Sequence, residues 1–533
     1  MSKWIALLCG AALASAQTTP TFQVGTRLVT VDVQARGEKG GAVKGLTKED
    51  FTLQDKGKTQ TISVFAVTDL SSAPTRKTDP LAANVASNRV NAGGLETRGA
   101  NVILFDRLNI PVIADQAVVR TKILALLASL RPTDRVGFYS LGTTLTMVQD
   151  FGDEASKLVE AAKRLSVPGS ASAGSDLLAA RLKDALAPME MQDMTVRTAT
   201  TSRAFQTIAR HLEGIKGRKN LIWVTSDFPL TYGLAADRRT NYESEVAHAV
   251  NTMSDANITV FPMDPRGVAG NASNSSLGKD NAAIPTSTKE GGLMPGRRSS
   301  GEEATSSVGL KASDTMQTIA NATGGKAYYY SNDIGPDVRT VLDEAEVTYT
   351  LGFYVEDKAL DGKTHELNVK LVKKPETNGA QLHYRKSYVA DNLQSAAAKQ
   401  QRPDMETLIT DAFDATAIGV MAASAPDPLK PGIHKVQVRV DAGDLQFEHL
   451  AGKWVASFDL GLSIEAANQK QSAVSNKTVN LSFTDEQLQQ ALRAGLIVDN
   501  TVPSPAQPAR LRVVVEDKGS GSAGSVRVPL FLQ

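Results

Sequence analysis

Apolar and polar residues alternate with a period of two near the start of the chain. Between residues 22 and 69, short alternating runs such as Leu28–Val33 are separated by glycine-containing turns. This pattern is typical of antiparallel strands, so we expect residues 17–70 to form an N-terminal β segment. Residues 71–99 are rich in Ser, Ala, Asn and Thr and have little apolar periodicity, which predicts a linker.

From residue 100 to residue 346, short apolar runs alternate with stretches of helical spacing. The run Val102–Phe105 suits a strand that is buried on both faces, and we expect helices over 176–186 and 200–215, among others. Strands alternating with helices in this way predict an α/β domain with a doubly wound, mainly parallel sheet. Residues 270–306 are rich in Ser, Gly and Asn and predict a mobile inserted loop.

The period of two returns after residue 346, where residues 347–390 contain strands and a hairpin turn. Residues 391–425 predict a helical connector, and residues 426–533 predict an antiparallel β-sandwich of immunoglobulin-like size. The segments 17–70 and 347–390 are each too small to bury a core alone. We therefore hypothesise that these two segments pack together as one β domain, into which the α/β domain is inserted.

The first sixteen residues, 1–16, have the features of a signal peptide. Lys3 gives a positive start, Trp4–Leu13 is an apolar run too short to span a bilayer, and Ala14–Ala16 supplies small residues, so we expect cleavage before Gln17. No later stretch approaches the ~20 continuous apolar residues of a membrane span. The sequence therefore predicts an exported protein, periplasmic or extracellular, without a transmembrane segment after cleavage.

Composition removes several classes of function. The single cysteine, Cys9, lies in the predicted signal peptide, so the processed chain has no thiol for a disulfide, a thiolate metal site or a nucleophile. The 58 basic and 57 acidic residues give a net charge of +1, which favours neither nucleic acid nor an anionic membrane as a partner. The chain contains no His-Glu-x-x-His, Gly-x-Ser-x-Gly or phosphate-loop motif, so no motif indicates an enzyme.

Candidate binding residues lie at the ends of predicted strands. In an open doubly wound sheet, ligands bind beyond the carboxyl ends of the strands, and Asp106, Asp227 and Asp264 follow strands there. Carboxylate and hydroxyl oxygens are the ligands that Mg²⁺ prefers. Arg107 and Arg266 stand beside the acids and favour the alternative, in which the charges pair with one another without a metal.

Several segments follow one another in an informative order: Gly45–Phe51, Asn101–Asp106, Lys216–Trp223, Asp264–Gly267 and Tyr349–Tyr388. Their order resembles a von Willebrand factor A (vWA) domain, and more specifically the acidobacterial vWA-related family of exported proteins. The resemblance covers most of residues 22–390. It implies a vWA-like α/β fold and a role in protein binding or cell adhesion.

The same resemblance implies a metal-ion-dependent adhesion site in degenerate form. The family's pattern Asp-x-Ser-x-Ser is replaced at residues 106–110, where Leu108 and Ile110 occupy both serine positions and neither can ligate a metal. Asp106 and Ser175 match the family's ligands in type and place, and two further residues are shifted substitutes. The candidate Mg²⁺ ligands are therefore Asp106, Asn109, Ser175 and Asp227.

The leading hypothesis is an exported, non-enzymatic protein-binding or adhesion module with a degenerate adhesion site. One alternative is a structural envelope or assembly protein that binds through β-sheet edges without a metal. A metal-dependent hydrolase is the third hypothesis, and it ranks below the other two because the sequence shows no nucleophile–base pair.

Overall fold

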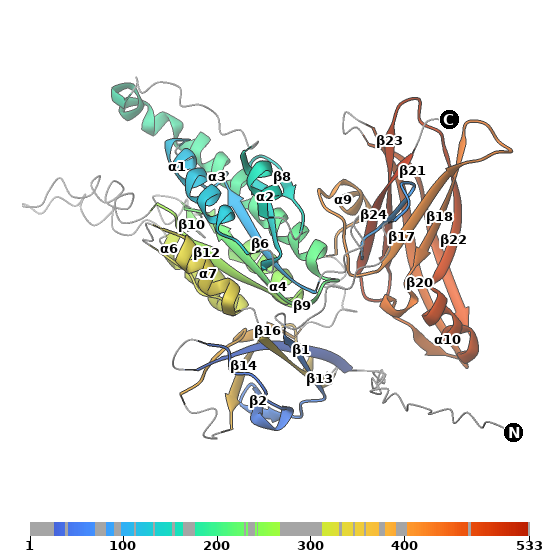
Figure 1. The fold of residues 1–533 in the computed structure, drawn as a ribbon, viewed down its shortest axis with the longest axis horizontal. Coiled ribbons are helices and arrows are strands. Elements are labelled where there is room, and N and C mark those ends of the chain that lie inside the picture. Colours follow the sequence, from blue (N-terminus) through green and yellow to red (C-terminus); the bar gives the residue numbers. More distant parts are fainter. Residues whose placement is uncertain are drawn as a thin grey trace, which may run out of the picture.

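The computed structural model arranges the chain as an α/β domain and two β units (Figure 1). The expected signal peptide (1–16) and the expected insertion (270–306) lie outside the residues that it describes. The described residues are 26–37, 41–69, 81–89, 98–110, 113–131, 134–151, 155–163, 176–226, 228, 231–232, 240–241, 243–266, 312–329, 333–344, 347–356, 359–372, 379–390, 402–466 and 471–530.

A five-stranded sheet in the order β12-β9-β6-β7-β8 forms the centre of the α/β domain. Four strands are parallel, and β8 joins the edge in the antiparallel sense. Every residue of β7 and β12 is buried, as is typical of a parallel sheet covered on both faces. The strands are β6 (Arg98–Asp106), β7 (Val136–Leu141), β8 (Leu145–Gln149), β9 (Lys216–Val224) and β12 (Ile258–Met263).

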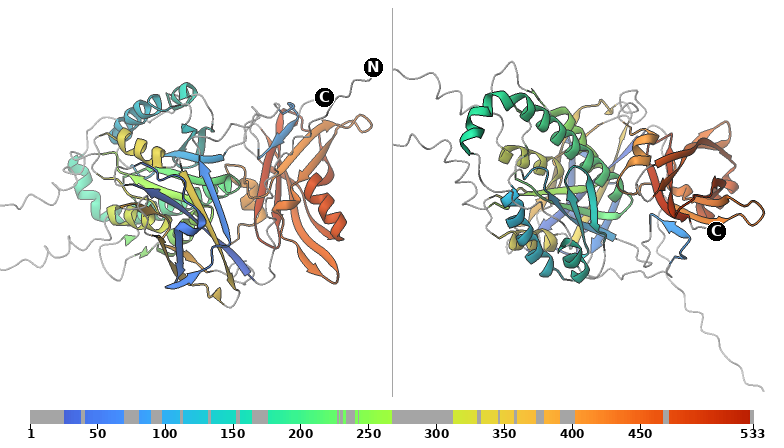
Figure 2. Two further views of the ribbon diagram at one scale, coloured as in Figure 1. Left: turned by 60° about the horizontal axis from the view of Figure 1, so that its bottom comes forward. Right: turned by 90° about the horizontal axis from the view of Figure 1, so that it is seen from above.

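Successive residues of β6 enter two different cores, because side chains of a strand alternate between its faces. Ile103 and Phe105 pack among residues of α1 and α7, whereas Leu104 packs with Trp223 among residues of α3 and α4. Figure 2 shows helices on both sides of this sheet. The helices of the domain are α1 (Ile113–Ala128), α2 (Ala155–Lys163), α3 (Asp176–Leu212), α4 (Glu243–Asp255), α6 (Ala312–Thr323) and α7 (Gly335–Glu344), and a short pair of strands, β10 (Thr231–Tyr232) and β11 (Thr240–Asn241), lies between β9 and α4.

Segments on either side of the α/β domain share one β unit. Strand β1 pairs with β13 in antiparallel register, with Val31 opposite Leu351, and β2 pairs with β14. Their apolar faces form one core that includes Val31, Leu53 and Phe353. The elements are β1 (Thr26–Arg36), η1 (Lys48–Asp50), β2 (Phe51–Asp55), β3 (Lys58–Gln60), β4 (Val64–Asp69), β13 (Val347–Glu356), β14 (Thr364–Leu371), β15 (Gln381–His383) and β16 (Ser387–Val389).

The C-terminal unit is built from two antiparallel sheets. One has the order β22-β18-β17-β5, and the other has the order β19-β20-β23-β24 with β21 paired to β20. Their inner faces share one apolar core, as expected for a sandwich. The elements are β5 (Val85–Ser87), α9 (Met405–Thr410), β17 (Val420–Pro426), β18 (Ile433–Val440), η6 (Ala442–Asp444), β19 (Glu448–Leu450), β20 (Lys453–Ala466), β21 (Gln471–Phe483), α10 (Asp485–Ala494), β22 (Leu496–Pro503), β23 (Ala509–Asp517) and β24 (Ala523–Leu530).

Three elements differ from the sequence-based expectations. The helices expected over 176–186 and 200–215 are joined in the single helix α3, which continues through Pro188 although proline disfavours a helix interior. The connector expected over 391–425 is helical in its described part only at α9, and β17 begins at Val420. The alanine-rich sequence of β17 has no strong β preference, so pairing with β18 and β5 determines that this segment forms a strand. The expected linker 71–99 contains β5, which pairs with β17.

Polar contacts join both β units to the α/β domain. On one side, the guanidinium of Arg385 donates to the carbonyl oxygens of Thr30 in β1 (2.7 Å) and of Ser254 near the end of α4 (3.2 Å). On the other side, the end of α3 meets the C-terminal unit, where Arg210 Nε donates to Asp411 Oδ2 at 2.9 Å. The α/β domain is therefore in direct contact with both β units.

Candidate functional site

The carboxyl ends of three parallel strands carry the residues that the sequence indicates as a binding site. Phe105 of β6 lies opposite Val224 of β9, which lies opposite Met263 of β12. Asp106 is the last residue of β6, while Thr225 and Asp264 directly follow β9 and β12, so the three residues lie side by side at the carboxyl end of the sheet.

Asp106 is fully buried, with 0% of its surface exposed. Its Oδ2 accepts hydrogen bonds from Asn109 Nδ2 (2.7 Å), from the indole Nε1 of Trp223 (2.8 Å) and from Thr225 Oγ1 (3.2 Å). Its Oδ1 accepts the backbone N–H of Asn109 at 3.0 Å. Burial raises the pKa of Asp106, and these hydrogen bonds partly oppose that effect. The carboxylate is thus surrounded by donors from the protein itself.

Asn109 connects the loop after β6 with α3 and β9. Its side-chain amide also donates to Thr201 Oγ1 at 2.8 Å, and its Oδ1 accepts from Arg197 Nε at 3.2 Å. Ser226 Oγ donates to the Asn109 carbonyl oxygen at 2.9 Å. Asn109 is itself fully buried, and both polar groups of its side chain have partners inside the protein.

The arginines at this edge are also engaged by the protein. Arg266 forms a bidentate ion pair with Asp264, with Nε 3.0 Å from Oδ1 and a terminal nitrogen 2.7 Å from Oδ2. It also donates to the Ser226 carbonyl oxygen at 2.9 Å. Arg107 Nε donates to Ser140 Oγ at 3.1 Å, and burial lowers the pKa of Arg107. The charge pairing considered from the sequence is present between Arg266 and Asp264.

Of the four candidate metal ligands, Asp106 and Asn109 are brought together, while Ser175 and Asp227 lie outside the described residues. The N–H groups of Asn109 and Trp223 are directed at the carboxylate oxygens that a cation would need. The carboxylate of Asp106 is therefore bound by donors of the protein, whereas a divalent ion needs ligand lone pairs directed at it. Among the residues that the structure describes, no group of three or more His, Cys, Asp or Glu side chains could hold a metal ion.

The partners of Asp106 were not predicted from the sequence. Trp223 reads as one of several apolar residues in its strand, and Thr201 and Arg197 read as positions within a helix. A buried Trp needs a partner for its indole N–H, and this requirement is a signal that points toward a polar residue on a neighbouring strand. The direction of the side chains in the fold supplies the rest.

His365 lies in a second polar cluster, within the N-terminal β unit. This buried imidazole places Nδ1 3.1 Å from Asp55 Oδ1 and Nε2 3.0 Å from Asp361 Oδ1. Tyr388 donates its hydroxyl to Asp55 Oδ2 at 3.0 Å, and burial is the main cause that raises the pKa of Tyr388. The cluster joins His365 of β14 to the end of β2, to β16 and to the turn at Asp361, so its contacts account for it as a structural feature.

Two solved structures are similar to this chain at a low level. One is an aerotolerance-related membrane protein from Bacteroides fragilis NCTC 9343 with multiple mutations to serine; it is 14% identical, the match covers 47% of this chain and 98% of that chain, and the TM-score is 0.24. The other is the conserved hypothetical protein BatB from Bacteroides thetaiotaomicron, at 16% identity, 47% and 99% coverage and a TM-score of 0.24. Similarity at this level carries no argument about function.

No family model matches the chain, and no curated protein matches it. Within the described part of the chain, no helix combines the length and the apolar character needed to cross a membrane.

Proposed function

We propose that this chain is an exported, non-enzymatic protein-binding module of vWA-like type, and that it binds its partner without a metal ion at Asp106. The observation that supports this proposal is the saturation of the Asp106 carboxylate by four donors of the protein in a fully buried position. Buried in this way, the carboxylate holds the strand ends together. The partner then binds the exposed surface around that edge.

The first test is the response of thermal stability to metal ions. A ligand that binds only the folded protein raises its melting temperature by mass action. For each protein, the wild type and Asp106→Asn, we expect the melting temperature in chelator to equal that in about 1 mM Mg²⁺ or Mn²⁺. A rise of several degrees that occurs in the wild type and is absent from Asp106→Asn would show a metal site at Asp106 and contradict the proposal.

The second test uses the exposed turn after β7, at the same end of the sheet. Thr143 is exposed there, whereas Ala128 is exposed at the C-terminal end of α1, near the opposite end of the strands. Labelled protein is titrated onto the cell-envelope fraction, with an excess of unlabelled protein as competitor. We expect saturable binding that is the same with and without chelator. Thr143→Arg should weaken this binding at least about tenfold, a loss of roughly 1.4 kcal/mol, whereas Ala128→Arg should leave it unchanged.

Each other outcome favours a different interpretation. Binding that is lost in chelator would support a metal-dependent site. Saturable binding that neither arginine variant changes would favour the alternative of an assembly protein that binds through its β-sheet edges. Absence of saturable binding would overturn the proposed function.

A further inference from the structure

A short segment from the N-terminal half of the chain completes the C-terminal sandwich. Residues 85–87 form β5 and pair antiparallel with β17, with Ala86 opposite Ala422. The ladder continues on both sides, because Ser424 N donates to the Asn84 carbonyl oxygen (3.0 Å) and Asn88 N donates to the Val420 carbonyl oxygen (3.1 Å). All three β5 residues are only half-buried. The segment therefore binds as an added strand, a known mode of peptide recognition.

Two asparagines bind the backbone at either end of this strand. Asn84 Nδ2 donates to the Ser424 carbonyl oxygen at 3.0 Å. Asn88 Nδ2 donates to the carbonyl oxygens of Ala415 and Ile418, both at 2.8 Å, and its Oδ1 accepts from Val420 N at 2.8 Å. These bonds use backbone groups of the sandwich, so they fix the register of the strand at both ends.

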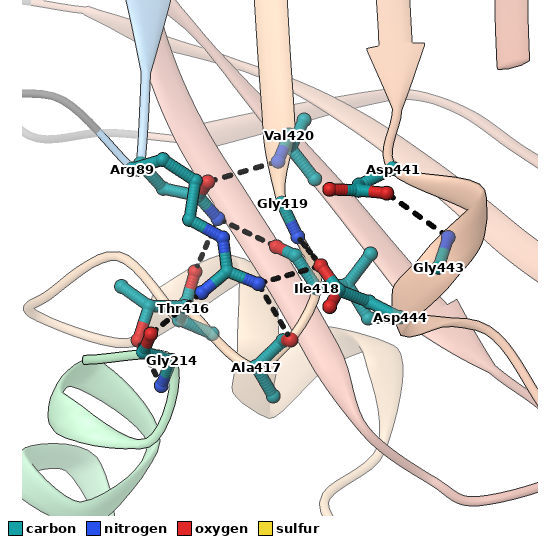
Figure 3. A network of polar contacts seen from close by, with 12 residues as sticks. Arg89, Gly214, Thr416, Ala417, Ile418, Gly419, Val420, Asp441, Gly443 and Asp444 are labelled. Carbon is teal, nitrogen blue, oxygen red and sulfur yellow. Dashed lines mark hydrogen bonds and ion pairs between the residues drawn. The ribbon is translucent and has the colours of Figure 1, made fainter. Parts of the chain in front are cut away.

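Arg89 follows directly and enters a polar pocket (Figure 3). Its terminal nitrogens donate to the carbonyl oxygens of Gly214 (2.8 Å) and Ala417 (3.1 Å) and to Asp444 Oδ2 (2.5 Å). Asp444 Oδ2 also accepts from Gly419 N at 2.8 Å, which orients the carboxylate. Gly214 lies just beyond the C-terminus of α3, where a cation is favoured by the helix dipole. The pocket thus recognises a guanidinium with a charge and with two carbonyl groups.

Two glycines make room for this guanidinium. A Cβ atom at Gly214 would lie 2.2 Å from an Arg89 terminal nitrogen and 1.8 Å from the Thr416 carbonyl oxygen. A Cβ atom at Gly419 would lie 3.0 Å from Arg89 Nε and 3.3 Å from Asp444 Oδ2. The pocket is therefore shaped around the arginine by residues from two different units of the protein.

We propose that the edge of β17 that pairs with β5, together with this pocket, forms a recognition site for an extended Asn-x-x-x-Asn-Arg strand. In this structure the chain's own residues 84–89 occupy the site, and the occupant in trans is the same segment of a second copy of the chain. Strand contacts to β17 are made through backbone groups, while the two asparagines and the arginine provide selectivity. The site lies where the C-terminal unit meets the end of α3, and it is separate from the strand ends at Asp106.

A peptide titration tests this site. The probe is a fluorescent, end-blocked peptide with the sequence of residues 82–89, and the protein is the full chain carrying Asn88→Ala and Arg89→Ala, so that its own segment is weakened. We expect saturable binding to this variant. We expect a peptide with Ala in place of the arginine to bind at least about tenfold weaker, because hydrogen bonds to charged groups are the strongest in the pocket.

Protein variants supply the controls. Wild-type protein should bind the peptide at least about a hundredfold more weakly, since its tethered segment competes at an effective concentration on the order of millimolar. Adding Asp444→Ala to the double variant should weaken binding as much as removing the peptide's arginine does. Asp499→Ala, which changes an exposed acid on β22, should leave binding unchanged.

Two results would overturn the proposal. One is equal binding of the arginine and alanine peptides, or no binding of either, by a double variant whose circular dichroism and melting curve show that it is folded. The other is failure of both the double variant and Arg89→Ala alone to fold, which would make residues 84–89 an inseparable part of the sandwich.

Discussion

The indole Nε1 of Trp223 donates a 2.8 Å hydrogen bond to Asp106 Oδ2, across the neighbouring strands β6 and β9. Trp223 is fully buried and packs edge-on against Phe205, with ring centroids 5.0 Å apart, and against Phe228 at 5.4 Å. The acid at the end of β6 is therefore bound to the aromatic core beneath it. This contact gives Asp106 a structural role, so substitutions at Asp106 and Trp223 should change the stability of the protein.

Asp106→Asn should lower the free energy of unfolding although it changes the side-chain volume very little. The carboxylate has two accepting oxygens, whereas an amide replaces one of them with a donor. That donor must face either the Asn109 N–H or the three donors at Oδ2. Leaving a buried donor unsatisfied costs about 1–3 kcal/mol, and we expect a loss in that range or above it in urea unfolding. A variant as stable as the wild type would contradict the structural role.

The bond between Trp223 and Asp106 should appear as a coupling between two substitutions. Trp223→Phe removes the indole donor and part of the aromatic packing. Because both residues share one hydrogen bond, the losses of Trp223→Phe and Asp106→Asn should add to more than the loss of the double variant, with a coupling of about 0.5–3 kcal/mol. The pair Asp106→Asn and Val528→Ala, with Val528 in the core of the C-terminal unit, is the control and should be additive.

The part of this site that follows from the sequence is the backbone, and the part that does not is the direction of its side chains. The apolar run before Asp106 predicts the strand correctly, and parallel strands bring their carboxyl ends to one edge. Whether Asp106 points outward to a ligand or inward to Trp223 depends on the twist of the sheet and on the position of α3. No local pattern near residue 106 carries that information.

Strand β5 shows a second limit of sequence patterns. Three residues are too few to establish a period of two, and Val85 is the only β-branched residue among them. The strand exists because β17 offers an open edge and because Asn84, Asn88 and Arg89 find partners there. Longer segments were predictable, since β1 and β13 have enough alternating residues for their apolar faces to be recognised.

Lys219 should make the stability of the protein depend on pH in the alkaline range. Its Nζ donates to the Ile215 carbonyl oxygen at 2.8 Å, and burial lowers its pKa to about 8, although the nearby carboxylate of Asp32 partly opposes this effect. An unfolded lysine has a pKa of about 10.4. Between these values the unfolded chain retains a proton that the folded chain has released, so the free energy of unfolding rises with pH.

The measurement compares wild type with Lys219→Met in chemical unfolding between about pH 7.5 and pH 10. The free energy of unfolding of the wild type, minus that of the variant, should rise across this window. The upper limit of this rise is roughly 3 kcal/mol for the complete transition. The comparison removes the contributions of other groups that titrate in both proteins. A constant difference between the two proteins would show that the lysine keeps its ordinary pKa in the folded state.

The contact between Arg210 and Asp411 should be strongly coupled, because both side chains are nearly buried where α3 meets the C-terminal unit. Their side chains are 11% and 6% exposed, and Asp411 also accepts a hydrogen bond from Thr207 Oγ1 at 3.0 Å. Removing one partner of a buried pair leaves an uncompensated charge and costs about 3–5 kcal/mol, whereas replacing both by apolar residues costs far less. We therefore expect Asp411→Leu and Arg210→Met each to lower the melting temperature more than the double variant does. If each single variant loses less than about 1 kcal/mol, as exposed pairs do, this contact contributes little to joining the α/β domain to the sandwich.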